Sequence, residues 1–339
     1  MSNQEVDPGE VVCGEGEVPS GVEILEPREV PLGGPRAMHV RRTLPQRHRS
    51  LIGAWCFVDH YGPDDVTISG GMSVAPHPHT GLQTVSWLFA GEIEHRDSAG
   101  IHAMVRPGEV NLMTAGRGIS HSEVSTEGTD VLHGAQLWVA LPAAVRDTEP
   151  GFQHHAPAPV RGPGWQARVF LGSLLGQTSP VVTHTPLLGA EIMLAPGATL
   201  EIDVDAGFEH GVLVDTGAVG IADSVDGAAT ETKPGELAYV GPGRDRLLLT
   251  AYDEARVLLL GGEPLGESIV MWWNFVGRTH EEIVGFRAEW QAQIVADGGE
   301  VVVPDGQDVR PGRFGIVTGE HLPPIPAPAL PNARLKERR

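Results

Sequence analysis

Short apolar runs, separated by glycine and proline, recur along most of this chain. Thr84–Phe89, Val110–Met113 and Leu132–Leu141 are examples from the first half. Runs of this length that are bounded by turn-forming residues are typical of β-strands. The 44 glycines and 28 prolines show no period and 41% of the residues are hydrophobic, so these residues indicate many tight turns rather than disorder. The pattern predicts an all-β protein.

One stretch in the second half has helical spacing instead. Thr279 followed by Glu282 forms a capping box, in which the threonine side chain accepts from a backbone N–H of the first turn. The apolar positions that follow have the spacing of one helical face: Ile283, Phe286, Trp290 and Ile294. Asp297-Gly298-Gly299 ends the pattern. We therefore expect a single α-helix over residues 279–296.

The second half of the chain repeats the turn pattern of the first. Arg106-Pro107-Gly108-Glu109 and Lys233-Pro234-Gly235-Glu236 both place a Pro-Gly turn ahead of a strand. This repetition predicts an internal duplication, and hence two β-barrels. We expect a flexible arm over residues 1–20, a first barrel over 21–150 and a Pro-rich linker over 151–165. A second barrel that includes the helix is expected over 166–296, and a Pro-rich tail that packs back on the body over 297–339.

Charge and composition narrow the class of function. The formal net charge is −20, and a surface that binds nucleic acid needs clustered positive charge, so we expect no nucleic-acid partner. Only two cysteines occur, Cys13 and Cys56, so no disulfide framework is expected. No apolar run reaches membrane-spanning length and the N-terminal residues lack the apolar core of a signal peptide, so we expect a cytoplasmic protein without a membrane anchor.

Two pairs of polar residues in the first half have the spacing that places both members on one face of a strand. His77 and His79 form one pair, and His121 and Glu123 form the other. Pro76 and Pro78 flank His77 and cannot donate to a β-ladder, so we expect this strand to lie at an edge or to be bulged. If the two strands are neighbours in one barrel, three imidazoles and one carboxylate converge into a metal site without thiolate.

Spacing alone leaves a second interpretation open. Chance gives about 0.7 His-x-His pairs in a chain with 15 histidines among 339 residues, so the alternative is two histidines in a Pro-rich loop and one exposed pair, which the order of the surrounding motifs makes the less favoured interpretation. If the site exists, its ligand set leaves positions of an octahedron vacant, whereas structural zinc is closed by four ligands. A catalytic or sensing metal is then expected.

Three longer segments of the sequence resemble the pirin family, whose members are two-domain proteins of the cupin superfamily. These segments are HPHTGLQTVSWLFAGEIEHRDSAG from His77, RPGEVNLMTAGRGISHSE from Arg106 and GAQLWVALP from Gly134. Gly71–His79 matches the first general cupin motif, G-x5-H-x-H, and Gln83 stands where many cupins carry a carboxylate. The resemblance implies a bicupin, with two double-stranded β-helix barrels face to face. It implies metal in the first barrel only, since Glu209-His210-Gly211 stands where a second His-x-His would lie.

The resemblance also implies an activity, that of a quercetin (flavonol) 2,3-dioxygenase that uses mononuclear Fe²⁺. The substrates would be a small phenolic compound and O₂, with Glu123 taking the proton of the 3-hydroxyl as general base. The implied metal ligands are His77, His79, His121 and Glu123. The implied substrate-binding residues are Met113, Trp138, Gln136 and Trp87; for Gln136 and Trp138 the alternative is a surface glutamine and a core tryptophan. Ni²⁺, Mn²⁺, Co²⁺, Cu²⁺ and Zn²⁺ are alternatives to iron.

A second function remains open, because some pirins act as metal-dependent regulators. In that case the protein would be a non-catalytic redox sensor that binds a protein partner. The family also implies a monomer. Two other segments receive structural roles: we expect His60 to be structural rather than a ligand, and Glu94, His95, Arg96 and Asp97 to form a charge network at the barrel rim, with His95 and Asp97 on one face of their strand.

Overall fold

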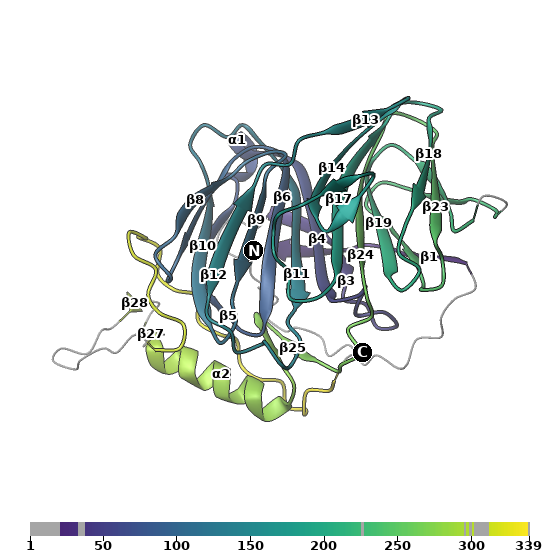
Figure 1. Cartoon of the computed structure of the whole chain (residues 1–339). Coiled ribbons are helices and arrows are strands. Elements are labelled where there is room, and N and C mark those ends of the chain that lie inside the picture. The colour runs from purple at the N-terminus through teal and green to yellow at the C-terminus, as the bar shows by residue number, and fades with distance from the viewer. Residues whose placement is uncertain are drawn as a thin grey trace.

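The computed structural model describes residues 21–32, 38–224, 227–294, 296–297, 300–301 and 312–337. Strands dominate these residues and form two β-barrels that stand side by side (Figure 1). The prediction of an all-β, two-barrel fold is therefore confirmed. The expected arm over residues 1–20 lies outside the described residues.

The first barrel closes one seven-stranded sheet against one four-stranded sheet. The larger sheet, in spatial order, consists of β12 (Gly151–His155), β9 (Val110–Thr114), β6 (Leu82–Ala90), β11 (Val131–Ala140), β4 (Trp55–Asp65), β3 (Met38–Leu44) and β2 (Arg28–Leu32). The smaller sheet consists of β5 (Ser73–His79), β10 (Ile119–Ser125), β7 (Ile93–Asp97) and β8 (His102–Val105). A short helix, α1 (Val66–Ser69), follows β4.

The second barrel repeats this plan, which is what an internal duplication predicts. Its seven-stranded sheet consists of β1 (Val22–Leu25), β22 (Leu237–Val240), β19 (Glu209–Thr216), β24 (Ala255–Gly262), β17 (Leu187–Leu194), β14 (Trp165–Leu171) and β13 (Val160–Gly162). Its four-stranded sheet consists of β18 (Thr199–Asp203), β23 (Arg246–Ala251), β20 (Val219–Ala222) and β21 (Thr230–Thr232). Two of the small hairpins of this half are β15 (Ser173–Leu174) with β16 (Gln177–Thr178), and β27 (Ala296–Asp297) with β28 (Glu300–Val301).

The two seven-stranded sheets pack against each other through a shared apolar core. Trp87 of the first barrel stacks on Phe170 of the second, with ring centroids 4.6 Å apart. The Trp55 indole N–H donates to the Gly261 carbonyl across the same interface, at 3.1 Å. Burial of apolar surface between the sheets is the main force that holds the barrels face to face.

Two of the expected domain boundaries differ in the structure. We expected Val22–Leu25 in the first barrel, but β1 pairs with β22 of the second. We expected residues 151–165 to be a linker, but β12 pairs with β9 and β13 pairs with β14. The chain between the barrels is therefore short, and the start of the chain reaches across to the second barrel. Strand pairing between distant segments decides both points, and composition does not record it.

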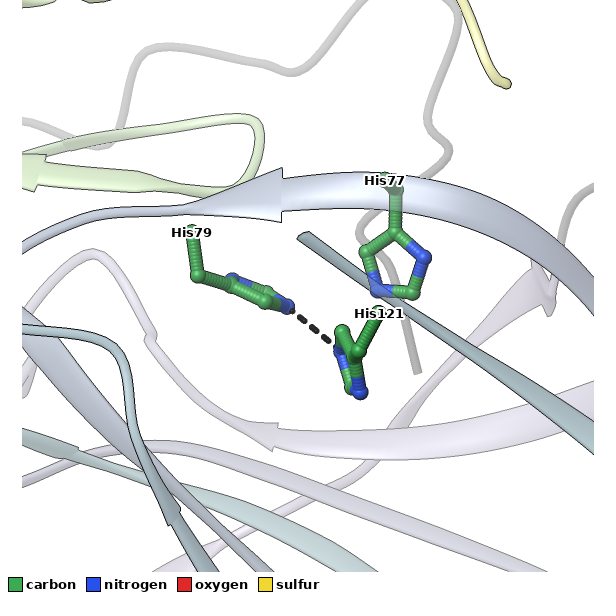
Figure 2. Close-up of side chains that lie close together, drawn as sticks. All are labelled: His77, His79 and His121. Atoms are coloured by element: carbon green, nitrogen blue, oxygen red, sulfur yellow. Dashed lines mark hydrogen bonds between the residues drawn. The ribbon is translucent and has the colours of Figure 1, made fainter. Parts of the chain in front are cut away.

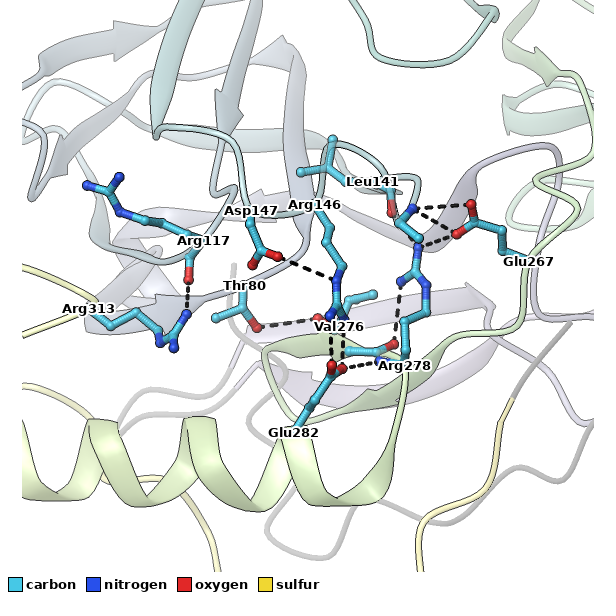
Figure 3. A network of polar contacts seen from close by, with 12 residues as sticks. Thr80, Arg117, Leu141, Arg146, Asp147, Glu267, Val276, Arg278, Glu282 and Arg313 are labelled. Atoms are coloured by element: carbon cyan, nitrogen blue, oxygen red, sulfur yellow. Dashed lines mark hydrogen bonds and ion pairs between the residues drawn. The ribbon is translucent and has the colours of Figure 1, made fainter.

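The helix also packs on the other barrel from the one we expected. Thr80 of the first barrel bridges to Phe275 in the hairpin of β25 (Val270–Trp272) and β26 (Phe275–Gly277). Helix α2 (His280–Gln293) follows this hairpin, and its Glu282 receives two hydrogen bonds of 2.7 Å from Arg146 of the first half (Figure 3). Thr279 accepts from the Glu282 N–H as the capping box predicts, but the helix ends at Gln293 rather than at residue 296.

The described part of the tail, residues 312–337, lies along the helix and the first barrel. Phe314 is buried against Trp290 of α2, with ring centroids 5.5 Å apart. The Ile325 N–H donates to the Pro76 carbonyl of β5 at 2.8 Å. No helix within the described ranges has the length and apolarity needed to cross a membrane.

Phe170→Ala tests the packing between the barrels. Removing a fully buried phenylalanine is expected to lower the free energy of unfolding by about 3–5 kcal/mol. A double-mutant cycle with Trp87→Ala should give a coupling of about 0.5–1.5 kcal/mol, because the stacked pair is lost only once. Tyr252→Ala, at a half-exposed position, is the control and should change stability by less than about 1 kcal/mol. Urea unfolding measures all of these, and a Phe170→Ala loss no larger than the control would contradict the shared core.

Candidate metal centre

Two neighbouring strands of the first barrel carry the expected ligands. β10 pairs with β5 so that His121 lies opposite His77, and the register shifts before Glu123 pairs with Val74. β5 is the edge strand of its sheet. An edge position suits Pro76 and Pro78, since proline has no N–H to donate to a neighbouring strand. Sequence neighbours on alternating positions thus point into the same space.

Three imidazole rings meet inside the barrel. The ring centroids are 4.3 Å apart for His77 and His121 and 5.0 Å apart for each of the other two pairs. The Nε2 atoms of His79 and His121 are 3.1 Å apart, and Figure 2 shows the rings turned toward one another. Two nitrogens bound at right angles to one metal ion, each at about 2.1 Å, would lie about 3 Å apart. The spacing therefore fits a shared metal ion.

The outer nitrogens of two of these rings are held by backbone carbonyls. His77 Nδ1 lies 2.9 Å from the Ala75 oxygen, and His79 Nδ1 lies 3.0 Å from the Asn274 oxygen. A carbonyl only accepts, so both Nδ1 atoms donate and each neutral ring keeps its lone pair on Nε2. His77 Nε2 is buried and has no hydrogen-bond partner within the described structure. Unpartnered lone pairs in a dry interior are costly, and a bound cation is the group that satisfies them.

Burial also fixes the charge of these rings. Desolvation lowers the pKa of His79 from 6.5 to about 3 and holds the pKa of His77 and of His121 well below 6.5. The rings are consequently neutral near pH 7, which is the form that binds a metal.

Glu123 lies beside this set of three rather than within it. Its carboxylate is buried, and it lies within 4.8 Å of ring nitrogens of His121 and His95. The structure thus brings together His77, His79 and His121. It places Glu123, the fourth expected ligand, beside His121 and His95. Three nitrogens with one adjacent carboxylate suit a divalent transition metal.

His95 and Asp97 are buried in the barrel, whereas we expected them at its rim. Along β7, positions 93, 95 and 97 point inward and positions 94 and 96 are partly exposed. His95 Nδ1 lies 3.4 Å from His121 Nδ1. Alternation in the sequence indicated that His95 and Asp97 share a face but gave no sign that this face is the inner one.

Three of the four expected substrate-binding residues face the inside of the first barrel. Trp138 lies edge-on to His79, with ring centroids 5.1 Å apart, and packs in one cluster with Met113. Gln136 accepts from the Ser86 hydroxyl at 2.8 Å, and its amide nitrogen has no partner within the described residues. Trp138 therefore lies next to the histidines, Met113 packs in the same cluster, and Gln136 lies two positions from Trp138 on β11.

Trp87 is a correction, because its side chain points away from the site. It belongs to the core between the barrels, where it stacks on Phe170. Every residue of β6 from Leu82 to Leu88 is buried, so both faces of the strand pack inside the protein. Thr84 and Ser86 lie on the face opposite Trp87, and Ser86 contacts Gln136.

A second buried cluster lies at the interface of the barrels but has the geometry of direct hydrogen bonding. His60 and His133 of the first barrel both donate from Nε2 to Asp215 Oδ1 of the second, at 2.7 and 2.5 Å. These distances are shorter than the spacing of two ligands on one metal ion. Arg256 adds an ion pair to Asp215 Oδ2 at 3.2 Å. His60 therefore has a structural position, as the sequence indicated.

Within the described residues, no group of three candidate ligands lies wholly in the second barrel. His210 stands where a second His-x-His would lie. It is buried on β19, and its ring nitrogens have no hydrogen-bond partner within the described residues. A cavity of about 510 Å³ between residues 48–53 and 264–268, with Glu209, contains none of the expected site residues.

Comparisons with known proteins agree with this architecture. The Pirin family model matches residues 37–139, and the model of the Pirin C-terminal cupin domain matches residues 189–295. A Pseudomonas aeruginosa protein that carries the name "Putative quercetin 2,3-dioxygenase" is 42% identical over 306 residues, covering 88% of this chain and 89% of its own length.

Solved structures give the same result. The crystal structure of quercetin 2,3-dioxygenase from Acinetobacter baumannii is 34% identical, with a TM-score of 0.81, and the alignment covers 93% of this chain and 98% of that one. A bacterial pirin from Escherichia coli, solved in complex with nickel(II), shares the fold at 18% identity, with a TM-score of 0.55 and coverage of 72% of this chain and 99% of its own.

Metal binding can be tested by removing single ligands. We expect the purified protein to bind one divalent ion per chain, and His77→Ala and His79→Ala to weaken binding by more than about 100-fold. A smaller loss, about 10- to 100-fold, is typical of changes outside the ligand shell. His154→Ala is the control, since this histidine is exposed and contacts Glu109 and Asn111 rather than the three rings. Elemental analysis with chelator competition gives the result, and unchanged binding in both alanine variants would contradict the site.

Asp215 should make stability depend on pH. Burial raises the pKa of Asp215, but hydrogen bonds from His133 and His60 outweigh it and hold the pKa below its ordinary value. The stabilisation is therefore complete above pH of about 4, the pKa in the unfolded chain, and is lost as the pH falls further. Asp215→Asn should show a shallower loss of stability between about pH 5 and pH 2 than the wild type. Asp215→Ala should cost at least about 1–3 kcal/mol at pH 7, because the buried Nε2–H groups of His60 and His133 both lose their acceptor. Equal pH slopes in wild type and Asp215→Asn, by urea unfolding, would contradict this assignment.

Proposed function

This chain belongs to the pirin family of two-domain cupins, and on that premise we propose that it is a metal-dependent dioxygenase that cleaves flavonols of the quercetin type with O₂. The observation that carries the proposal is the convergence of three neutral imidazoles, with a buried carboxylate beside them, in the first barrel. A relative with 34% identity that covers nearly the whole chain is named for this activity, which supports the choice of substrate class.

The residues of the chain divide the work of such a reaction. His77, His79 and His121 would hold the metal through Nε2. When bound, a divalent iron supplies a position for the substrate oxygen and electron exchange with O₂. Glu123 is the one carboxylate next to the three rings in the clusters of the described structure, so it is the base that takes the proton of the 3-hydroxyl.

The residues beside the histidines suit a flat phenolic substrate. The Trp138 ring is stacked on Phe57, with ring centroids 4.0 Å apart, and this contact fixes its position. The rest of the ring offers an aromatic surface to the substrate. The amide nitrogen of Gln136 and the hydroxyl of Tyr61 are buried without partners in the described residues, so they are available to substrate hydroxyl and carbonyl oxygens. A buried donor that only the substrate satisfies contributes to specificity.

Iron is the metal we propose, on the family's precedent. The donor set itself suits nickel, manganese, cobalt or copper as well, and the Escherichia coli pirin was solved with nickel(II). Activity is therefore best measured on protein reconstituted with each of these ions separately.

Glu123→Gln separates proton transfer from metal binding. The variant should retain metal, because the three imidazoles remain, and should lose about 10²- to 10⁴-fold in kcat for quercetin, because the amide cannot accept the proton. O₂ uptake and flavonol absorbance measure turnover, and elemental analysis measures loading. Glu94→Gln is the matched control, since Glu94 lies on the neighbouring strand but faces outward and is partly exposed.

The proposal would be contradicted if the metal-loaded wild type turned over no flavonol with any of these ions. Full turnover in Glu123→Gln would contradict only the role of the base. A metal-loaded but inactive protein would leave the regulator as the function to test, by looking for a protein partner whose binding depends on the oxidation state of the metal.

A further inference from the structure

The ring of His121 is held differently from those of His77 and His79. The Nδ1 atoms of His77 and His79 face backbone carbonyls, at 2.9 and 3.0 Å. His121 Nδ1 instead faces the Nδ1 of another histidine, His95, at 3.4 Å. One of these two nitrogens must donate and the other must accept.

Asp97 decides which of the two donates. Its Oδ2 lies 3.2 Å from His95 Nε2, and its Oδ1 accepts from the backbone N–H groups of Ala99 and Ile101, at 2.9 and 3.0 Å. The carboxylate is thus fixed by the turn that follows β7 and accepts a hydrogen bond from His95 Nε2–H, which keeps the proton on Nε2. A neutral His95 then has its lone pair on Nδ1, where it accepts from His121 Nδ1.

This assignment completes a common pattern for all three ligands. His121, like His77 and His79, then donates from Nδ1 and keeps a lone pair on Nε2, which faces His79 at 3.1 Å. Pairing of β7 with β10 fixes the arrangement, because His121 lies opposite Asp97 and Glu123 lies opposite His95. Phe152 packs over the His95 ring with centroids 5.0 Å apart, so the group is shielded from water.

We propose that His95 and Asp97 are positioning residues of the metal centre, which act through His121 by fixing its tautomer and ring orientation. The proposal rests on the metal centre of the proposed function, but not on its substrate. A histidine that donates to a carboxylate-bound partner is a stronger ligand, and loss of such an outer partner typically weakens metal binding about 10- to 100-fold.

The experiment measures the affinity for Co²⁺ and the visible absorption spectrum, without any flavonol. His95→Phe keeps an aromatic ring and removes the acceptor, so the dissociation constant should rise about 10- to 100-fold. His95→Asn places an amide oxygen near the former Nδ1 and should recover part of the affinity. Asp97→Asn should also weaken binding, because it no longer fixes the tautomer of His95. His102→Gln is the control, because His102 lies on the adjoining strand and is exposed.

The outcomes separate the possibilities. A folded His95→Phe that binds Co²⁺ within about threefold of wild type would overturn the proposal, as would equal affinity in His95→Phe and His95→Asn. A change in the spectrum that reports a lost nitrogen ligand would show that His95 binds the metal itself, and would also overturn it. If His95→Phe fails to fold, the comparison of His95→Asn and Asp97→Asn with wild type decides.

The test is independent of the oxygenase activity. Wild-type protein that binds Co²⁺ with the expected dependence on His95, but turns over no flavonol with any metal, would contradict the proposed function alone. Wild-type protein that binds no Co²⁺ would contradict the metal centre and this proposal together.

Discussion

Three imidazole lone pairs face one another in a space from which water is excluded. That arrangement is unfavourable unless a cation lies between them, because each nitrogen has given up its hydrogen bonds to water. It also requires that every ring be prevented from turning its N–H inward. The structure meets this requirement at each ring with a separate acceptor: the Ala75 carbonyl, the Asn274 carbonyl and the His95 ring. Much of the local architecture can be understood as the means of placing these three acceptors.

Segments from the C-terminal half of the chain supply one of these acceptors to the histidines of the first barrel. Asn274 reaches His79 only because the β25–β26 hairpin and helix α2 pack against the first barrel. The Phe314 carbonyl of the tail then accepts from the hydroxyls of Ser98 and Ser120, next to the strand ends that carry the ligands. These segments therefore supply one acceptor to the histidines and cover the barrel near the same strands.

The second barrel has the same strand plan but a different use of its buried polar groups. Its Asp215 accepts directly from His60 and His133, and an arginine balances the charge. Buried carboxylates and imidazoles thus lie together in both barrels, and the hydrogen bonds separate their roles. The Nε2 atoms of His79 and His121 face each other at 3.1 Å with no proton assigned between them, whereas His60 and His133 each donate directly to Asp215 at 2.7 and 2.5 Å. Within the described residues, the second barrel therefore contributes packing and hydrogen bonds to the interface between the barrels, and no group of three candidate ligands of its own.

The sequence by itself determined the strands, the duplication, the capping box of the helix and the pairing of His77 with His79 on one face, because these depend on residues close together in the chain. It did not determine which face of a strand is the inner one. β6 is buried on both sides, so exposure did not reveal that Trp87 points to the second barrel, and β7 carried His95 and Asp97 without a sign of their depth. Nor did it reveal Asn274, since a backbone carbonyl has the same chemistry in every residue. Only the tertiary structure decided these points, because long-range strand pairing sets which faces are buried and which carbonyls approach the three histidines.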